Sequence, residues 1–261
     1  MGKYFDDLHA MPDSQLGNAP CRILDSPEVA AARGAPDFDG MAKLARALSR
    51  QLRYREALSV YALMLRLKPD DTPTIRARVP WEINTLQPRL AIADLLRCRA
   101  GGWDEADVSY RFGIASYLAG DYPTAMWELA TCFPLVDDEM GIAAMYWHTM
   151  AAWRHGAVPE LLQHYRPDMK CGHHTAYAAV MSFAAGRLPR NDLLKMIGDT
   201  KSDLEFSMLA YGASVYLWQE GAAIEGRALR RQIIARDSFW ISYAYLAAWN
   251  DEYFGGIANG Q

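Results

Sequence analysis

The sequence predicts an all-α protein built from consecutive antiparallel helix pairs. Ala57, Ala91 and Ala125 stand 34 residues apart, and apolar residues recur around them at helical spacing. Gly120 and Pro69 lie where this helical pattern is interrupted, as is typical of residues that form turns or end helices. Hydrophobic residues make up 51% of the chain, which is enough for a substantial core. A fixed period of 34 residues is typical of helix–turn–helix repeats.

Each residue type at this period has a structural reason. A small residue on the first helix of a pair, such as Ala45 or Gly113, and an Ala on the second helix let the two backbones approach closely. Gly120 accepts the left-handed conformation that ends a helix. Pro69 stops the second helix of the first pair. We therefore expect Ala125 to lie at a tight contact between two helices.

These residues resemble the tetratricopeptide repeat family. The first repeat carries Leu44, Ala45, Leu48, Tyr54, Ala57, Tyr61 and Pro69. The third repeat carries Phe112, Gly113, Gly120, Tyr122, Ala125 and Leu129. The resemblance implies an α-solenoid of about six antiparallel helix pairs in a right-handed superhelix, closed by a capping helix near 238–254.

The remaining repeats follow the pattern less strictly. Residues 143–168 predict a helix, a turn at Gly156, a second helix and a stop at Pro167. Residues 175–199 predict a shorter pair around Gly186, and residues 204–237 restore the full pattern. In the second repeat, Pro80 falls within the expected first helix, so that this helix either kinks or starts late at Pro80.

The chain divides by composition into two regions. Residues 1–36 carry Gly, Pro, Asp and Ser clusters around one short helix candidate, in which Ser26 is the expected cap. This region predicts a partly irregular arm, and 37–261 predicts the repeat domain. In layout, residues 40–250 resemble the NlpI-type bacterial tetratricopeptide lipoproteins, which are adaptors, although their lipid-attachment sequence is missing here.

Composition excludes several functional classes. The net charge of −4 disfavours nucleic acid as a partner, because phosphate binding needs a basic face. No apolar run is long enough to span a bilayer. The four cysteines are widely scattered and are expected to be reduced, mostly buried thiols. These features predict a cytoplasmic protein, or an envelope protein if an export signal has been removed.

The resemblance implies that the first helix of each pair lines a concave surface that binds another polypeptide. We expect a protein or peptide ligand with acidic or carboxylate features, bound without enzymatic activity, cofactor or metal. The alternative is that the aromatic side chains simply pack against neighbouring repeats or the amino-terminal arm. The candidate partner-binding residues are Arg46, Arg50, Tyr110, Ile114, Tyr117, Tyr146, Met150 and Trp153.

Two rival functions remain open. In the first, the chain is a metal-dependent enzyme or metal-binding protein, because imidazole and thiolate groups concentrate within 27 residues. No established metal-ligand spacing appears among them. In the second, the chain is a bacterial peptide-sensing regulator. The residues of the histidine–cysteine cluster are His148, His155, His164, Cys171, His173 and His174.

Overall fold

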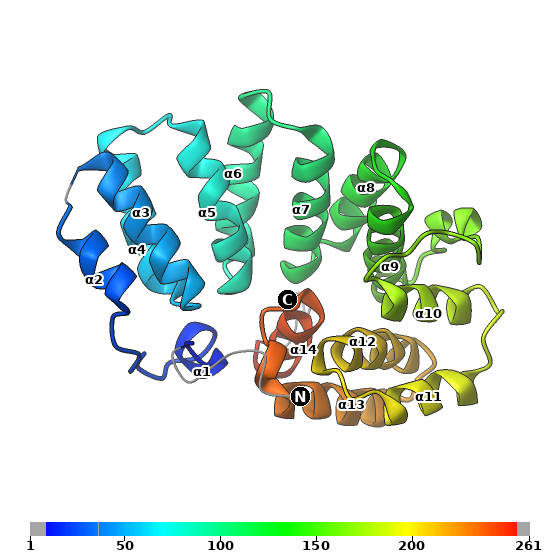
Figure 1. Ribbon diagram of the computed structural model, residues 1–261. Coiled ribbons are helices and arrows are strands. Elements are labelled where there is room, and N and C mark those ends of the chain that lie inside the picture. Colours follow the sequence, from blue (N-terminus) through cyan, green and yellow to red (C-terminus); the bar gives the residue numbers. More distant parts are fainter. Residues whose placement is uncertain (1–8, 36, 255–261) are drawn as a thin grey trace. The chain divides into compact units, whose positions relative to one another are not determined.

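The computed structural model describes residues 9–35 and 37–254 of the chain, and every regular element in these residues is helical (Figure 1). The predicted all-α class is therefore confirmed. The chain forms two compact units, Met1–Trp103 and Asp104–Gln261. Within the described part, no helix has both the length and the apolar character needed to cross a membrane.

Helix pairs make up most of the first unit. Helix α3 packs against α4, and α5 packs against α6, while α2 lies against α3. The helices of this unit are α1 (Pro12–Gln15), α2 (Pro27–Arg33), α3 (Phe38–Arg50), α4 (Tyr54–Leu67), α5 (Thr72–Asn84) and α6 (Pro88–Ala100).

Helices of 10 to 18 residues form the second unit. Helix α7 packs against α8, α8 against α9, α12 against α13 and α13 against α14. The α-helices of this unit are α7 (Glu105–Leu118), α8 (Tyr122–Cys132), α9 (Asp138–His155), α10 (Thr175–Ala184), α11 (Arg190–Asp199), α12 (Asp203–Gln219), α13 (Ala223–Ala235) and α14 (Tyr243–Tyr253). Three 3₁₀ turns complete its described part: η1 (Phe133–Leu135), η2 (Glu160–His164) and η3 (Asp237–Phe239).

The 34-residue period reappears in the positions of the helices. Helices α4, α6 and α8 begin at residues 54, 88 and 122, each 34 after the one before. The fourth residue of each is the predicted alanine (Ala57, Ala91 or Ala125), and all three are fully buried. The expected close packing at these alanines is thus confirmed. A methyl group suits such a position because a larger side chain would push neighbouring helices apart.

A left-handed residue precedes each of these helices by two positions. Gly120 has φ +80°, as predicted, but the equivalent positions are occupied by Leu52 at φ +56° and Leu86 at φ +54°. Leucine strains this conformation by roughly 1–2 kcal/mol because its Cβ crowds the backbone. The turn geometry therefore recurs even where the expected glycine is missing.

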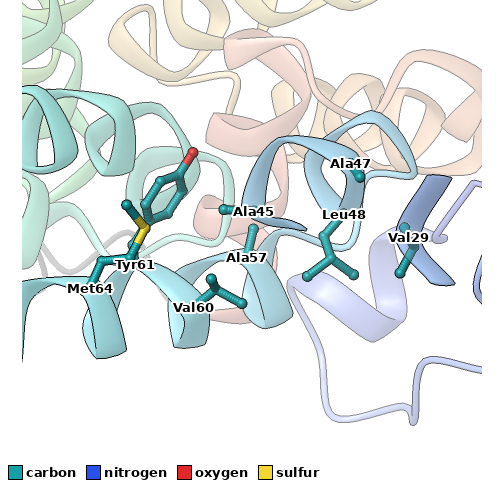
Figure 2. Close-up of a cluster of buried hydrophobic side chains, with 8 residues drawn as sticks. All are labelled: Val29, Ala45, Ala47, Leu48, Ala57, Val60, Tyr61 and Met64. Atoms are coloured by element: carbon teal, nitrogen blue, oxygen red, sulfur yellow. The ribbon is translucent and has the colours of Figure 1, made fainter. Parts of the chain in front are cut away.

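The core of the first unit joins the amino-terminal arm to the first helix pair. Val29 on α2 lies beside Leu48 on α3, and Ala45 on α3 lies beside Ala57 on α4 in the same buried cluster (Figure 2). Ser26 caps α2 by accepting a hydrogen bond from the Val29 amide, so the predicted short helix is confirmed. The arm thus packs along α3 and α4; residues 1–8 and 36 lie outside the described residues.

Three local predictions need correction. The second helix expected within 157–167 is only the 3₁₀ turn η2. Helix α5 does not start late at Pro80 but at Thr72, because the Asp71 side chain caps it by accepting from the Thr74 amide. The closing helix α14 begins at Tyr243 rather than near 238, where η3 intervenes.

Candidate functional site

Five of the predicted partner-binding residues lie in the interior of the second unit. Their exposed fractions are 6% or less, so they cannot form the open side of a groove. The expectation that these side chains face solvent is wrong, and the alternative of packing against neighbouring helices is correct for them. These residues are Ile114, Tyr117, Tyr146, Met150 and Trp153.

Hydrogen bonds and ring contacts explain why these aromatic residues are buried. The Tyr117 and Tyr211 hydroxyl oxygens lie 2.7 Å apart, and the Tyr146 hydroxyl donates to the Met208 carbonyl at 2.8 Å. Trp147 packs edge-on against Tyr117, with ring centroids 5.1 Å apart. Helix α9 is buried continuously from Gly141 to Trp153, so this stretch presents no solvent-facing side.

The other three candidates are more accessible. Tyr110 on α7 is half-buried, and its ring lies 6.4 Å from that of Tyr243. Arg46 and Arg50 on α3 are exposed. Arg50 forms an ion pair with Glu28 of the arm. The arginines and the aromatic residues therefore belong to different units, and the aromatic set is a core rather than a binding surface.

A pocket of about 510 Å³ opens in the first unit instead. One face of α4 forms one wall, because its four lining residues are spaced as i, i+3, i+4 and i+7. The carboxyl end of α5 and the start of α6 form the rest. The lining residues are Arg55, Leu58, Ser59, Ala62, Arg78, Glu82, Thr85, Gln87 and Leu90.

A buried ion network lies at this pocket. Arg78 makes a two-pronged contact with Asp94, from Nε to Oδ2 at 2.7 Å and from Nη2 to Oδ1 at 2.8 Å. The same Nε lies 3.0 Å from Oε1 of Glu82. Oε2 of Glu82 is buried and has no hydrogen-bond partner among the described residues. One carboxyl of the network is therefore incompletely satisfied.

The electrostatics of Glu82 follow from this arrangement. Burial raises the pKa of Glu82 to about 8, the nearby Asp94 also acts to raise it, and Arg78 only partly opposes them. At pH 7 the carboxyl is therefore mostly protonated, and it can donate a hydrogen bond. Arg55 and Arg78 then carry two positive charges against the single negative charge of Asp94. The pocket consequently favours ligand groups that accept hydrogen bonds or carry negative charge.

Arg55 connects the pocket to the amino-terminal arm. Its Nε donates to the Gln15 carbonyl at 2.7 Å, and its backbone amide donates to the Gln15 side chain at 3.1 Å. These contacts hold an otherwise exposed guanidinium beside the pocket. A positioned cation loses less side-chain entropy when it binds a ligand than a freely moving one does.

The histidines that are close in the sequence do not all lie close together in the structure. His148 is buried within α9, whereas His155 and His164 are exposed. His173 and His174 instead lie beside Glu139, near the start of α9. The acidic run 137–139 precedes and opens a helix, where capping is the ordinary role, and Asp137 does cap α9 by accepting from the Met140 amide. The Glu139 side chain instead accepts a hydrogen bond from the His173 amide, a contact that sequence reasoning missed.

Sequence reasoning also missed the network at the pocket. Arg78 and Glu82 are four residues apart, and they interrupt an otherwise apolar helix segment. That spacing is the signal that could have found them, since charges at i and i+4 on a helix can pair with one another. The contribution of Asp94 depends on how α6 packs against α5, which the local sequence does not specify.

Comparisons with known proteins add no relative. No family model matches the sequence, and no curated protein matches it. The resemblance to tetratricopeptide repeats therefore rests on residue types and spacing.

Proposed function

We propose that this protein is a non-enzymatic binding module that takes a peptide segment of another protein into the pocket bounded by α4, α5 and α6. The proposal includes helix pairs of tetratricopeptide type, supported by the 34-residue spacing of helix starts and buried alanines. The ligand is a segment with carboxylate or carbonyl groups to meet Arg55 and Glu82. The proposed binding site therefore lies in the first unit and not at the aromatic residues predicted from the sequence.

The observation that carries this proposal is the unpartnered Oε2 of Glu82. An unsatisfied buried polar atom costs roughly 1–3 kcal/mol. Among the described residues with such an atom, Glu82 is the one that lines this pocket. Because this atom is shielded from solvent, a ligand carbonyl or carboxylate would reach it after the Glu82 side chain turns toward the pocket that it lines. Leu58, Ala62 and Leu90 would contact the apolar parts of the same segment.

The same pocket offers poor support for catalysis. The Ser59 hydroxyl donates to the Arg55 carbonyl at 3.1 Å, and the Thr85 hydroxyl donates to the Trp81 carbonyl at 2.7 Å. Neither hydroxyl is therefore oriented toward a general base, as an activated nucleophile would be. Binding, rather than covalent chemistry, is the function that these side chains favour.

The experiment is a peptide-binding titration with matched variants. Short peptides selected from a random display library on the full chain would be labelled and titrated by fluorescence anisotropy. We expect selected peptides to be enriched in Asp, Glu or a free carboxyl terminus. Arg55→Ala should weaken their binding at least about tenfold, the loss expected for a charge-assisted hydrogen bond.

Arg66→Ala is the matched control, because Arg66 is an exposed arginine on the same helix but outside the pocket. It should leave the affinity unchanged. If Arg55→Ala and Arg66→Ala bind the selected peptides as tightly as the wild type does, or if selection yields basic peptides, the proposed pocket is wrong.

A further inference from the structure

Three side chains of types that can ligate metals lie together, one in the first turn of α9 and two just before α10. One carboxylate oxygen of Glu139 and one ring nitrogen each of His173 and His174 lie within 4.8 Å of one another. A tetrahedral ion with ligand bonds of about 2.0–2.1 Å separates its ligand atoms by about 3.3 Å. His173 is exposed and its Nδ1 already contacts Oε1 of Glu139, so we expect rotation of the His173 side chain to open the separation that an ion requires.

Backbone hydrogen bonds help to bring these side chains together. The His173 amide donates to Oε1 of Glu139 at 3.3 Å, and the Lys170 amide donates to Asp138 at 3.2 Å. Gly172 has φ +49°, and a Cβ at this position would overlap the Glu139 carboxylate. The segment before α10 is therefore held against the first turn of α9, which places Glu139 beside both histidines.

His174 has the secondary contact that metal-binding histidines usually have. Its Nδ1 lies 2.9 Å from the Glu139 backbone carbonyl, to which it can only donate. The proton then resides on Nδ1, which leaves the lone pair of Nε2 available as a ligand.

We infer that Glu139, His173 and His174 bind one divalent transition-metal ion of the Zn²⁺ class, with water completing the coordination. Two imidazoles and one carboxylate form a ligand set typical of zinc sites that keep an open position. The site is in the second unit and is independent of the peptide pocket of the first unit. An ion here would join α9 to the segment before α10, so binding would also stabilise the second unit.

The rival explanation is a simple ion pair between protonated His173 and Glu139, which are in contact. The two explanations differ in what they predict for a metal titration. An ion pair has no need of His174 and gives no defined stoichiometry with a metal. A metal site requires all three side chains and gives a stoichiometric end point.

The test uses the full chain, expressed without a histidine tag, stripped with a chelator and titrated with ZnCl₂ against a zinc-sensitive dye. We expect one Zn²⁺ per chain, with affinity weaker at about pH 6 than at about pH 8 because the ligands must be deprotonated. CoCl₂ titration should give the visible absorption bands of a low-coordinate Co²⁺ ion.

Single variants then assign the ligands. Glu139→Gln, His173→Ala and His174→Gln should each weaken Zn²⁺ binding by at least about tenfold. His155→Gln and His164→Gln are matched controls on exposed histidines of the same unit, and they should bind as the wild type does. Because His173 is exposed, His173→Ala keeps the test valid even if Glu139→Gln fails to fold.

Absence of a one-to-one end point would overturn the inference. So would equal Zn²⁺ affinity in His173→Ala and in the His155→Gln control.

Discussion

Gly113 on α7 and Leu129 on α8 occupy the same gap between their helices. A Cβ placed on Gly113 would lie 2.5 Å from Cγ of Leu129, far inside van der Waals contact, and Leu129 is fully buried. Gly113→Ala should therefore lower the free energy of unfolding by about 1–3 kcal/mol through overpacking. Leu129→Ala alone should cost about 2–5 kcal/mol by leaving a cavity.

The pair can be tested by a double-mutant cycle measured by chemical denaturation. The methyl group of Gly113→Ala would partly fill the space that Leu129→Ala vacates, so the double variant should be less destabilised than the sum of the single variants. Strictly additive losses would show that the two residues do not share this space.

Gly120 and Gly198 should respond oppositely to alanine. Gly120 has φ +80°, so Gly120→Ala should cost about 1–2 kcal/mol through backbone strain. Gly198 lies within α11, and an alanine methyl there would point into open space, so Gly198→Ala should stabilise by about 0.5 kcal/mol. Thermal unfolding of both variants checks this prediction. A melting temperature raised by Gly120→Ala would contradict the left-handed turn.

His148 should make stability depend on pH. Burial lowers the pKa of His148 to about 4, from 6.5 for an exposed histidine, and its Nδ1 has no partner among the described residues. Below about pH 6.5, His148 is protonated in the unfolded chain but stays neutral in the folded chain. Stability should therefore fall from about pH 6.5 toward pH 4, by up to about 1.4 kcal/mol per pH unit from this residue alone.

The measurement is the free energy of unfolding at several pH values for His148→Gln and for His155→Gln. His148→Gln should flatten the slope, whereas His155→Gln, at an exposed position, should keep it. Equal slopes for His148→Gln and the wild type would show that His148 is not buried as described.

Glu82 should give the opposite pH dependence. Its folded pKa, about 8, lies above the ordinary value of 4.5, so between these values the folded chain holds a proton that the unfolded chain has released. Stability should fall as the pH rises from about 4.5 to about 8, by a total of a few kcal/mol. Glu82→Gln removes this loss and should be more stable than the wild type above about pH 8, as measured by urea unfolding.

Glu160→Gln is the control for Glu82→Gln, because Glu160 is exposed. It should leave the slope above about pH 5 unchanged. The quantity to compare is the free energy of unfolding of the wild type minus that of Glu82→Gln. If this difference does not fall between about pH 5 and pH 8, the burial of Glu82 is contradicted.

Local sequence rules predicted much of the fold. Small residues at Ala57, Ala91 and Ala125 are required wherever two helices approach closely, and Gly120 is favoured in a left-handed turn, so spacing alone located these contacts. Leu86 shows the limit of this reasoning. It adopts the same turn without the residue that favours it, because the packing of the adjoining helices outweighs a local strain of about 1–2 kcal/mol.

The candidate sites were harder to predict. Tyr146 and Trp153 lie on a helix that is buried on nearly every side, so periodicity could not say which side faces solvent. The environment of Glu82 depends on Asp94, which lies on another helix. Glu139 and His174 are 35 residues apart in the sequence, and only the fold brings them together.

The most direct test of the account is the pH dependence of peptide affinity. Kd for a selected acidic peptide would be measured from about pH 6.5 to about pH 9.5 in the wild type and in Glu82→Gln, whose amide donates a hydrogen bond but cannot ionise. The wild type should lose affinity as the pH passes about 8, the pKa of Glu82, while Glu82→Gln should bind equally well throughout. The same pH profile in both proteins would contradict a peptide site at Glu82.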